Sequence, residues 1–181
     1  MSKFTDDFKD LIRIFNELEV RYLMIGGYAV VAHGHIRNTK DLDLWVDYQG
    51  DNAQKVARAL EQFGVSVDAN EFAHPKKVLF LGVEPNRVDI LTTVKGIEFE
   101  AAFSQKTSVK IDDLDILLID KQSLILVKRG METAYAKMTP AERILELEEL
   151  RELALLFNPK LKAQSKSSSF KIWGWRDWDA P

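Results

Sequence analysis

Apolar residues in the first two thirds of the chain recur with two periods, one typical of helices and the other of strands. The helical period predicts amphipathic helices over residues 5–18 and 51–63 and shorter helices over 28–34 and 97–103. Strand-like runs cover residues 22–25, 41–46, 77–83, 87–92, 107–111 and 115–119. Strands interspersed with helices predict an α/β (α+β) protein, with a mixed sheet flanked by helices.

After residue 119 the pattern becomes helical. Asp120 is expected to cap a helix that ends near Lys128, and the capping sequence at Thr139 predicts a second helix that runs to about Phe157. The composition then changes to Lys and Ser and ends in the Trp-rich stretch WGWRDWDAP. We therefore predict a core over 1–119, C-terminal helices packed on it over 120–158, and a linker with an extended Trp-rich tail over 159–181.

Two aspartates stand out in the predicted strand 41–46. Asp41 and Asp43 occupy positions i and i+2, so their side chains leave the same face of the strand, about 7 Å apart along it. Two carboxylates on one face can converge on divalent cations such as Mg²⁺ or Mn²⁺. A solvated strand face is the alternative, and the similar pair Asp113 and Asp115, which falls in a predicted turn, is interpreted in that way.

Two further features separate the first pair from the second. Gly26 and Gly27 directly follow a buried strand and precede a short helix, an arrangement that binds phosphate through backbone N–H groups. Asp89 lies in the middle of the apolar strand 87–92, where an unpaired charge would cost several kcal/mol. Asp89 therefore either pairs with Arg87 on the same face or joins Asp41 and Asp43 in a three-carboxylate site for two metal ions.

The motifs combine into one pattern over residues 20–92: an apolar strand before Gly26-Gly27, a Tyr-Ala pair, His33-Gly34, Arg37-x-Thr39-x-Asp41-Leu42-Asp43-Leu44 and the strand residue Asp89. This pattern resembles the DNA polymerase beta-type nucleotidyltransferase superfamily. Within it, the chain is similar to small prokaryotic nucleotidyltransferase-like proteins, which include minimal nucleotidyltransferases and the AbiE-type toxins of toxin–antitoxin systems.

The resemblance implies transfer of NMP from an NTP such as ATP to a hydroxyl, with release of pyrophosphate and Mg²⁺ as cofactor. Catalytic and metal-binding roles would fall to Asp41, Asp43 and Asp89, and nucleotide contacts to Gly26, Gly27 and Lys128. Arg37 and Thr39 either contact the nucleotide as well or shape the loop and pair with Asp41. In many relatives an Arg-x-Lys-Asp segment follows the lysine, and the present chain does not clearly match it. A catalytically inert binding protein, such as a toxin–antitoxin component or nucleotide sensor, is therefore the alternative.

Composition narrows the classes of partner. A formal net charge of −3 argues against a surface built entirely for nucleic-acid backbone. The chain has no Cys, no secretory signal and no apolar run near the ~18 residues of a membrane span, so we expect a cytoplasmic protein without membrane contact. The acceptor is left open among tRNA, protein and small molecules, and the tail either docks on a partner, stacks on bases or folds back on the domain.

Overall fold

The computed structural model describes residues 4–35, 39–83, 86–137 and 139. The chain divides into two compact units, Met1–Ala134 and Tyr135–Pro181. The described part of the second unit comprises the end of the last helix and Thr139. The helix predicted to follow Thr139 and the predicted tail lie outside the described residues, so both of them and the proposed domain boundaries stay predictions.

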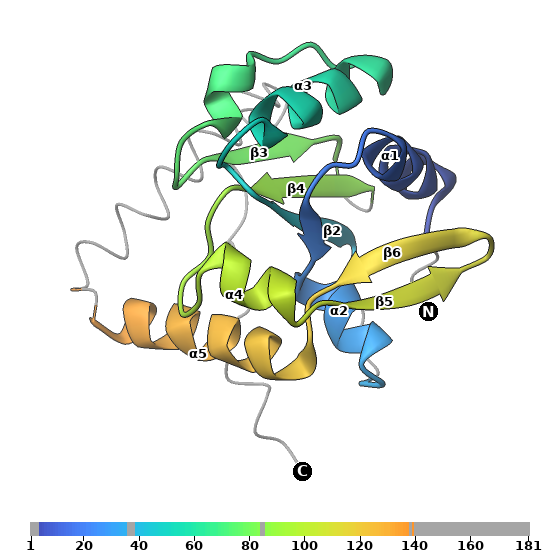
Figure 1. Ribbon diagram of the computed structural model, residues 1–181. Helices are drawn as coiled ribbons and strands as arrows, with labels where there is room; N and C mark the ends of the chain where they lie inside the picture. The colour runs from blue at the N-terminus through green and yellow to red at the C-terminus, as the bar shows by residue number, and fades with distance from the viewer. Residues whose placement is uncertain (1–3, 36–38, 84–85, 138, 140–181) are drawn as a thin grey trace, which may run out of the picture. The chain divides into compact units, whose positions relative to one another are not determined.

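The first unit contains one mixed sheet of six strands, in the order β3-β4-β2-β1-β6-β5 (Figure 1). The strands are β1 Tyr22–Met24, β2 Asp41–Val46, β3 Val78–Leu81, β4 Arg87–Leu91, β5 Thr107–Ile111 and β6 Leu114–Leu118. Strands β3 and β4, and likewise β5 and β6, form antiparallel hairpins at the two edges. In the middle, β1 runs antiparallel to β2 and parallel to β6, and β2 runs parallel to β4.

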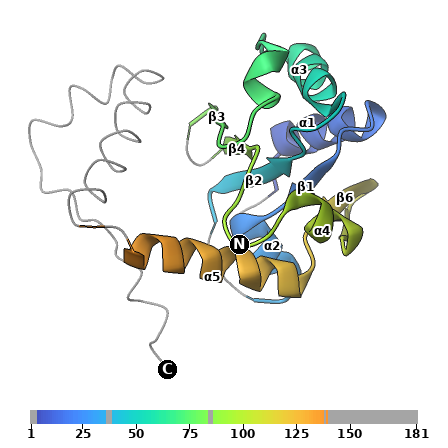
Figure 2. The same cartoon turned by 60° about the vertical axis from the view of Figure 1, so that its left-hand side comes forward.

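Helices lie on both faces of the sheet (Figures 1 and 2). They are α1 Asp6–Glu17, α2 Gly26–Ala32, α3 Asn52–Gln62, α4 Phe99–Ser104 and α5 Lys121–Lys137, with a short 3₁₀ helix at Ala69–Phe72. Thr5 begins α1 as predicted, because its Oγ1 accepts a hydrogen bond of 3.3 Å from the Phe8 N–H. These elements confirm the predicted α/β class with a mixed, helix-flanked sheet.

The two faces of β2 differ as its alternating sequence predicts. Leu42, Leu44 and Val46 are fully buried on one face. The other face carries Asp41, Asp43 and Trp45. Trp45 is buried as well, because the edge of its ring meets the Phe99 ring of α4 at a centroid distance of 5.1 Å and its Nε1–H donates to the Thr92 carbonyl. The polar part of this face is therefore confined to the start of the strand.

The helix after Asp120 was expected to end near Lys128. This is wrong, since α5 continues to Lys137. Gly130 lies inside this helix instead of ending it. A Cβ at Gly130 would stand 2.6 Å from the Lys95 carbonyl oxygen and 2.7 Å from the Gly96 Cα, so glycine is needed there for close packing against a loop. Among the described residues, no helix combines the length and apolar character that crossing a membrane requires.

Candidate active site

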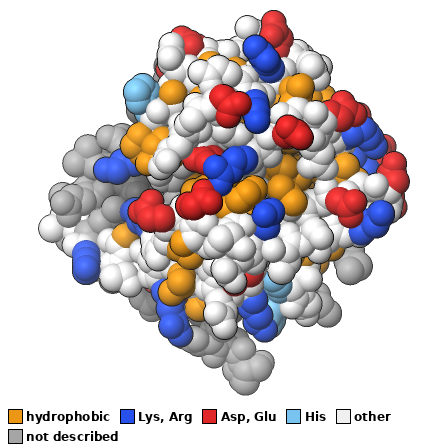
Figure 3. All heavy atoms as spheres, in the orientation of Figure 1, with side chains coloured by type: hydrophobic (Ala, Val, Ile, Leu, Met, Phe, Trp, Pro, Cys, Tyr) orange, Lys and Arg blue, Asp and Glu red, His pale blue; other side chains and the backbone are white. Residues whose placement is uncertain are grey.

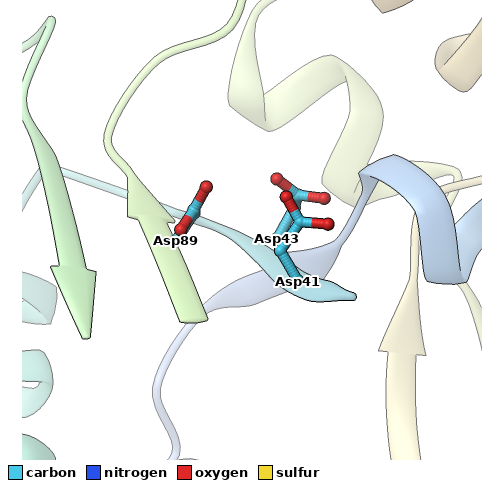
Figure 4. Close-up of side chains that lie close together, drawn as sticks. All are labelled: Asp41, Asp43 and Asp89. Atoms are coloured by element: carbon cyan, nitrogen blue, oxygen red, sulfur yellow. The ribbon is translucent and has the colours of Figure 1, made fainter. Parts of the chain in front are cut away.

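Three carboxylates gather where β2 and β4 run side by side. The parallel register pairs Asp43 with Asp89 and, two residues earlier on both strands, Asp41 with Arg87. Each of the three aspartates offers an oxygen that lies within 4.8 Å of the others, and all three side chains point to the same side of the sheet (Figure 4). The sequence therefore predicted this grouping correctly, although it could not show which strands are neighbours.

The glycine pair places the start of α2 directly against the carboxylates. The Ile25 N–H donates to the Asp43 carbonyl at 3.0 Å, which extends the pairing of β1 with β2 to the residue just before the helix. Gly26 then adopts a φ of +64°, and a Cβ there would lie 1.8 Å from Asp43 Oδ2. A Cβ on Gly27 would lie 2.1 Å from Thr39 Oγ1. Both glycines are thus required for close packing, whether or not a phosphate also binds there.

Arg87 neutralises part of the acidic cluster. Its Nε and Nη2 donate to the two oxygens of Asp89 at 2.7 and 2.9 Å, and Nη2 also reaches Asp41 Oδ2 at 3.1 Å. The ion pair between Arg87 and Asp89 that the sequence suggested as an alternative therefore coexists with the carboxylate cluster. The additional contact of Arg87 with Asp41 was not predicted. The only local signal for it was the position of Arg87, two residues before Asp89.

Asp43 has the most perturbed carboxyl group of the three. Burial, together with the nearby charges of Asp41 and Asp89, raises its pKa to about 7 against the lowering effects of the Gly27 N–H and of Arg87. A carboxylate in this environment gains strongly from a cation placed against it. The donor set suits such an ion, because three convergent carboxylates provide the oxygen ligands that Mg²⁺ and Mn²⁺ take.

The remaining predicted contacts differ in their placement. Thr39 is buried beside the cluster, and its Oγ1 donates weakly to the Asp41 backbone and side chain at 3.3 and 3.4 Å. Arg37 lies outside the described residues. Lys128 is a half-buried residue of α5, the helix that was expected to follow Asp120. Asp115 of the second Asp-x-Asp pair is exposed and lies 4.0 Å from Lys110, which agrees with its interpretation as a surface residue.

Comparison with known proteins bears on the same region. Residues 7–93 match the family model of aminoglycoside-2''-adenylyltransferase, and this range includes Gly26, Gly27 and all three aspartates. A search of curated proteins found no match.

A solved structure from Thermotoga maritima, described as a "putative nucleotidyltransferase", aligns with 80% of this chain and 88% of its own, at 15% identity and a TM-score of 0.48. The region that matches the family model contains β1 to β4, the glycine pair and the three carboxylates. The chain is a small nucleotidyltransferase-fold protein.

Proposed function

We propose that the protein is a metal-dependent nucleotidyltransferase that transfers NMP from an NTP to an acceptor hydroxyl. The acceptor oxygen would bond to the α-phosphorus, the bond from that phosphorus to the bridging oxygen would break, and pyrophosphate would leave. The observation that supports this most directly is the convergence of Asp41, Asp43 and Asp89 beside the glycine pair, within the region that matches an adenylyltransferase family.

The three aspartates are proposed to have different roles, which follow from their positions on β2 and β4. Asp41 and Asp43 are neighbours on β2 and would together hold the metal ions, two of which are proposed. Asp89 faces Asp43 from β4, so it can hold one ion and accept the proton of the attacking hydroxyl. Bound divalent ions would stabilise the charge on the attacking and leaving oxygens.

Nucleotide contacts are proposed for Gly26, Gly27, Arg37, Thr39 and Lys128. The Gly27 N–H bonds to the Asp43 carboxylate, so the backbone at the glycine pair is well placed to bind phosphates beside metal ions held there. Thr39 contributes by holding the backbone and side chain of Asp41. The cations Arg37 and Lys128 are proposed to balance the triphosphate charge.

For the acceptor we propose a small hydroxyl-bearing molecule, with ATP as donor and an aminoglycoside as the first acceptor to test. The description of the matching family supports this order. Figure 3 shows acidic and basic side chains interspersed on the visible face, which favours a small acceptor over a polyanion such as tRNA. Transfer to tRNA or to a protein side chain remains an outcome of the assay.

The test is incubation with each labelled NTP and Mg²⁺, with either an aminoglycoside panel or a total cell extract as acceptor. Wild-type protein should label an acceptor, and Asp43→Asn should abolish labelling. Asp115→Asn is a matched control, since it alters the exposed Asp-x-Asp pair, and it should retain full labelling. Full activity of Asp43→Asn would contradict the assignment of Asp43.

The competing function is nucleotide binding without transfer, as in a sensor or a toxin–antitoxin component. The two hydrogen bonds from Arg87 to Asp89 favour this binding function, because a carboxylate with both oxygens engaged is less free to accept a proton. Binding of an NTP with no label transferred to any acceptor would support this alternative.

A further inference from the structure

Arg87 is hydrogen-bonded to two of the three carboxylates, Asp41 and Asp89. It lies beside Asp41 across the β2–β4 pair and two residues before Asp89 on its own strand. The Arg87 side chain is 30% exposed, compared with 10% for Asp89 and 34% for Asp41, so Arg87 joins a buried carboxylate to a partly exposed one.

We propose that Arg87 is a resident counter-cation that competes with divalent metal for Asp41 and Asp89 and thereby sets the metal affinity of the nucleotide-free protein. This inference rests on the proposed metal site. Three carboxylates within 4.8 Å would repel one another strongly, and Arg87 offsets part of that charge before any ion binds. The arginine is therefore a positioning residue, which acts on the metal ligands rather than on the reacting atoms.

The hydrogen-bond geometry explains why the two cations compete. Nε and Nη2 occupy both oxygens of Asp89, and Nη2 is shared with Asp41, so Arg87 uses three carboxylate contacts at once. A divalent ion must approach such oxygens to about 2.1 Å, which places it close to the guanidinium charge. Metal entry thus requires Arg87 to give up at least part of these contacts.

Arg87 also contacts an aromatic ring outside the carboxylate cluster. Its Cζ lies 5.5 Å from the centroid of the Phe80 ring on β3, and Phe80 is paired with Asp89 across the hairpin. A guanidinium over an aromatic face retains a favourable cation–π contact. A shift of the guanidinium from the carboxylates towards Phe80 would therefore open the cluster and keep this contact.

The test measures Mn²⁺ binding to metal-free protein without nucleotide, by the loss of the EPR signal of free Mn²⁺. Arg87→Met should bind Mn²⁺ about tenfold more tightly or better than wild type, because a positive charge near the ion is removed. Arg87→Lys, which keeps the charge but not the two-pronged contact, should fall in between and still tighten binding. In EDTA, Arg87→Met should melt at a lower temperature, and Mn²⁺ should raise its melting temperature more than that of wild type.

Arg21→Met is the matched control. Arg21 also pairs with a buried carboxylate, Asp47 at 2.9 Å, and lies against the rings of Phe99 and Phe103. Its replacement should lower stability and leave Mn²⁺ affinity unchanged. An equal gain in affinity in this control would contradict a specific role for Arg87.

Asp43→Asn separates failure of the inference from failure of the proposed function. If Asp43→Asn binds Mn²⁺ as wild type does, the proposed metal site itself is wrong. If wild-type binding depends on Asp43 but neither Arg87 variant binds more tightly, the metal site stands and the counter-cation role of Arg87 is overturned. Tighter binding in both Arg87 variants, together with loss in Asp43→Asn, supports both proposals.

Discussion

At the residue scale, the tightest constraint in the site is the space around Gly26. Its φ of +64° disfavours any side chain, and an added Cβ would lie 1.8 Å from Asp43 Oδ2. Gly50 has the same φ of +64°, but a Cβ there would meet no atom within 4 Å. The two glycines therefore share their backbone strain and differ in their contact with the site.

This difference leads to a prediction for Gly26→Ala and Gly50→Ala. Gly50→Ala should cost only the backbone strain, about 1 kcal/mol, with nucleotide transfer retained. Gly26→Ala should cost more, about 2–4 kcal/mol, and abolish transfer because α2 and Asp43 must move apart. Urea unfolding and the labelling assay measure both effects. Equal stability losses in the two variants would show that the clash with Asp43 is relieved at no cost.

Asp43 gives a second prediction, for the dependence of stability on pH without metal. The folded-state pKa of about 7 exceeds the ordinary value of 3.8, so the folded protein keeps a proton that the unfolded chain releases. Stability should therefore fall as the pH rises from about 4 to about 7, by at most about 4 kcal/mol from this group. Above pH 7 this contribution stays constant.

Asp43→Asn removes that titration. In EDTA, the free energy of unfolding of Asp43→Asn relative to wild type should increase between pH 5 and pH 8, as measured by urea denaturation at each pH. A difference that does not change over this range would mean that Asp43 ionises normally in the folded protein.

At the scale of elements, one buried side chain joins three parts of the fold. Asn52 begins α3, accepts a hydrogen bond from the Arg21 N–H at 2.7 Å, and donates to the carbonyls of Arg21 and Asp47 at 3.1 and 2.8 Å. Arg21 directly precedes β1 and Asp47 directly follows β2. Asn52 therefore fixes the ends of the two strands that bring Gly26 and Asp43 together.

Asn52→Ala should lower the free energy of unfolding by about 2–4 kcal/mol, because it leaves buried backbone groups without partners. Asn70→Ala is a suitable control, since Asn70 is exposed and its hydrogen bonds with Asp68 and Ala73 use its backbone, so its cost should stay below about 0.5 kcal/mol. Chemical denaturation of both variants makes the comparison. A cost at Asn52 as small as that at Asn70 would contradict the joining role.

The elements also show what local sequence can predict. The six strands and the helices α1 to α4 were expected within a few residues, since alternation, helical spacing and glycines are local signals. The 3₁₀ helix at Ala69–Phe72 was not expected. The order of the strands was not predicted, because the pairing of β2 with β4 brings together residues far apart in the chain. The contact of Arg87 with Asp41 depends on that register, and so does the burial of Trp45 by α4. The length of α5 was missed because Gly130 serves tertiary packing instead of ending the helix.

At the scale of the whole molecule, nucleotide binding must appear as added stability. A ligand that binds only the folded state stabilises it by about 2.7 kcal/mol at a concentration of 100 times its dissociation constant. For a chain of this length, each kcal/mol shifts the melting temperature by about 2–4 °C. A matching NTP with Mg²⁺ should therefore raise the melting temperature by roughly 5–10 °C.

The four NTPs can be compared by differential scanning fluorimetry, with Mg²⁺, with EDTA, and with Mg²⁺ plus Asp43→Asn. Because the proposed site needs both the ion and the carboxylates, the shift should appear in wild type with Mg²⁺ and largely disappear in the other two conditions. Asp115→Asn should behave as wild type, since that carboxylate is exposed and lies on β6, which β1 separates from β2 in the sheet. A melting temperature that no NTP changes would contradict both the transferase and the binding-only function, because each requires the folded protein to hold a nucleotide.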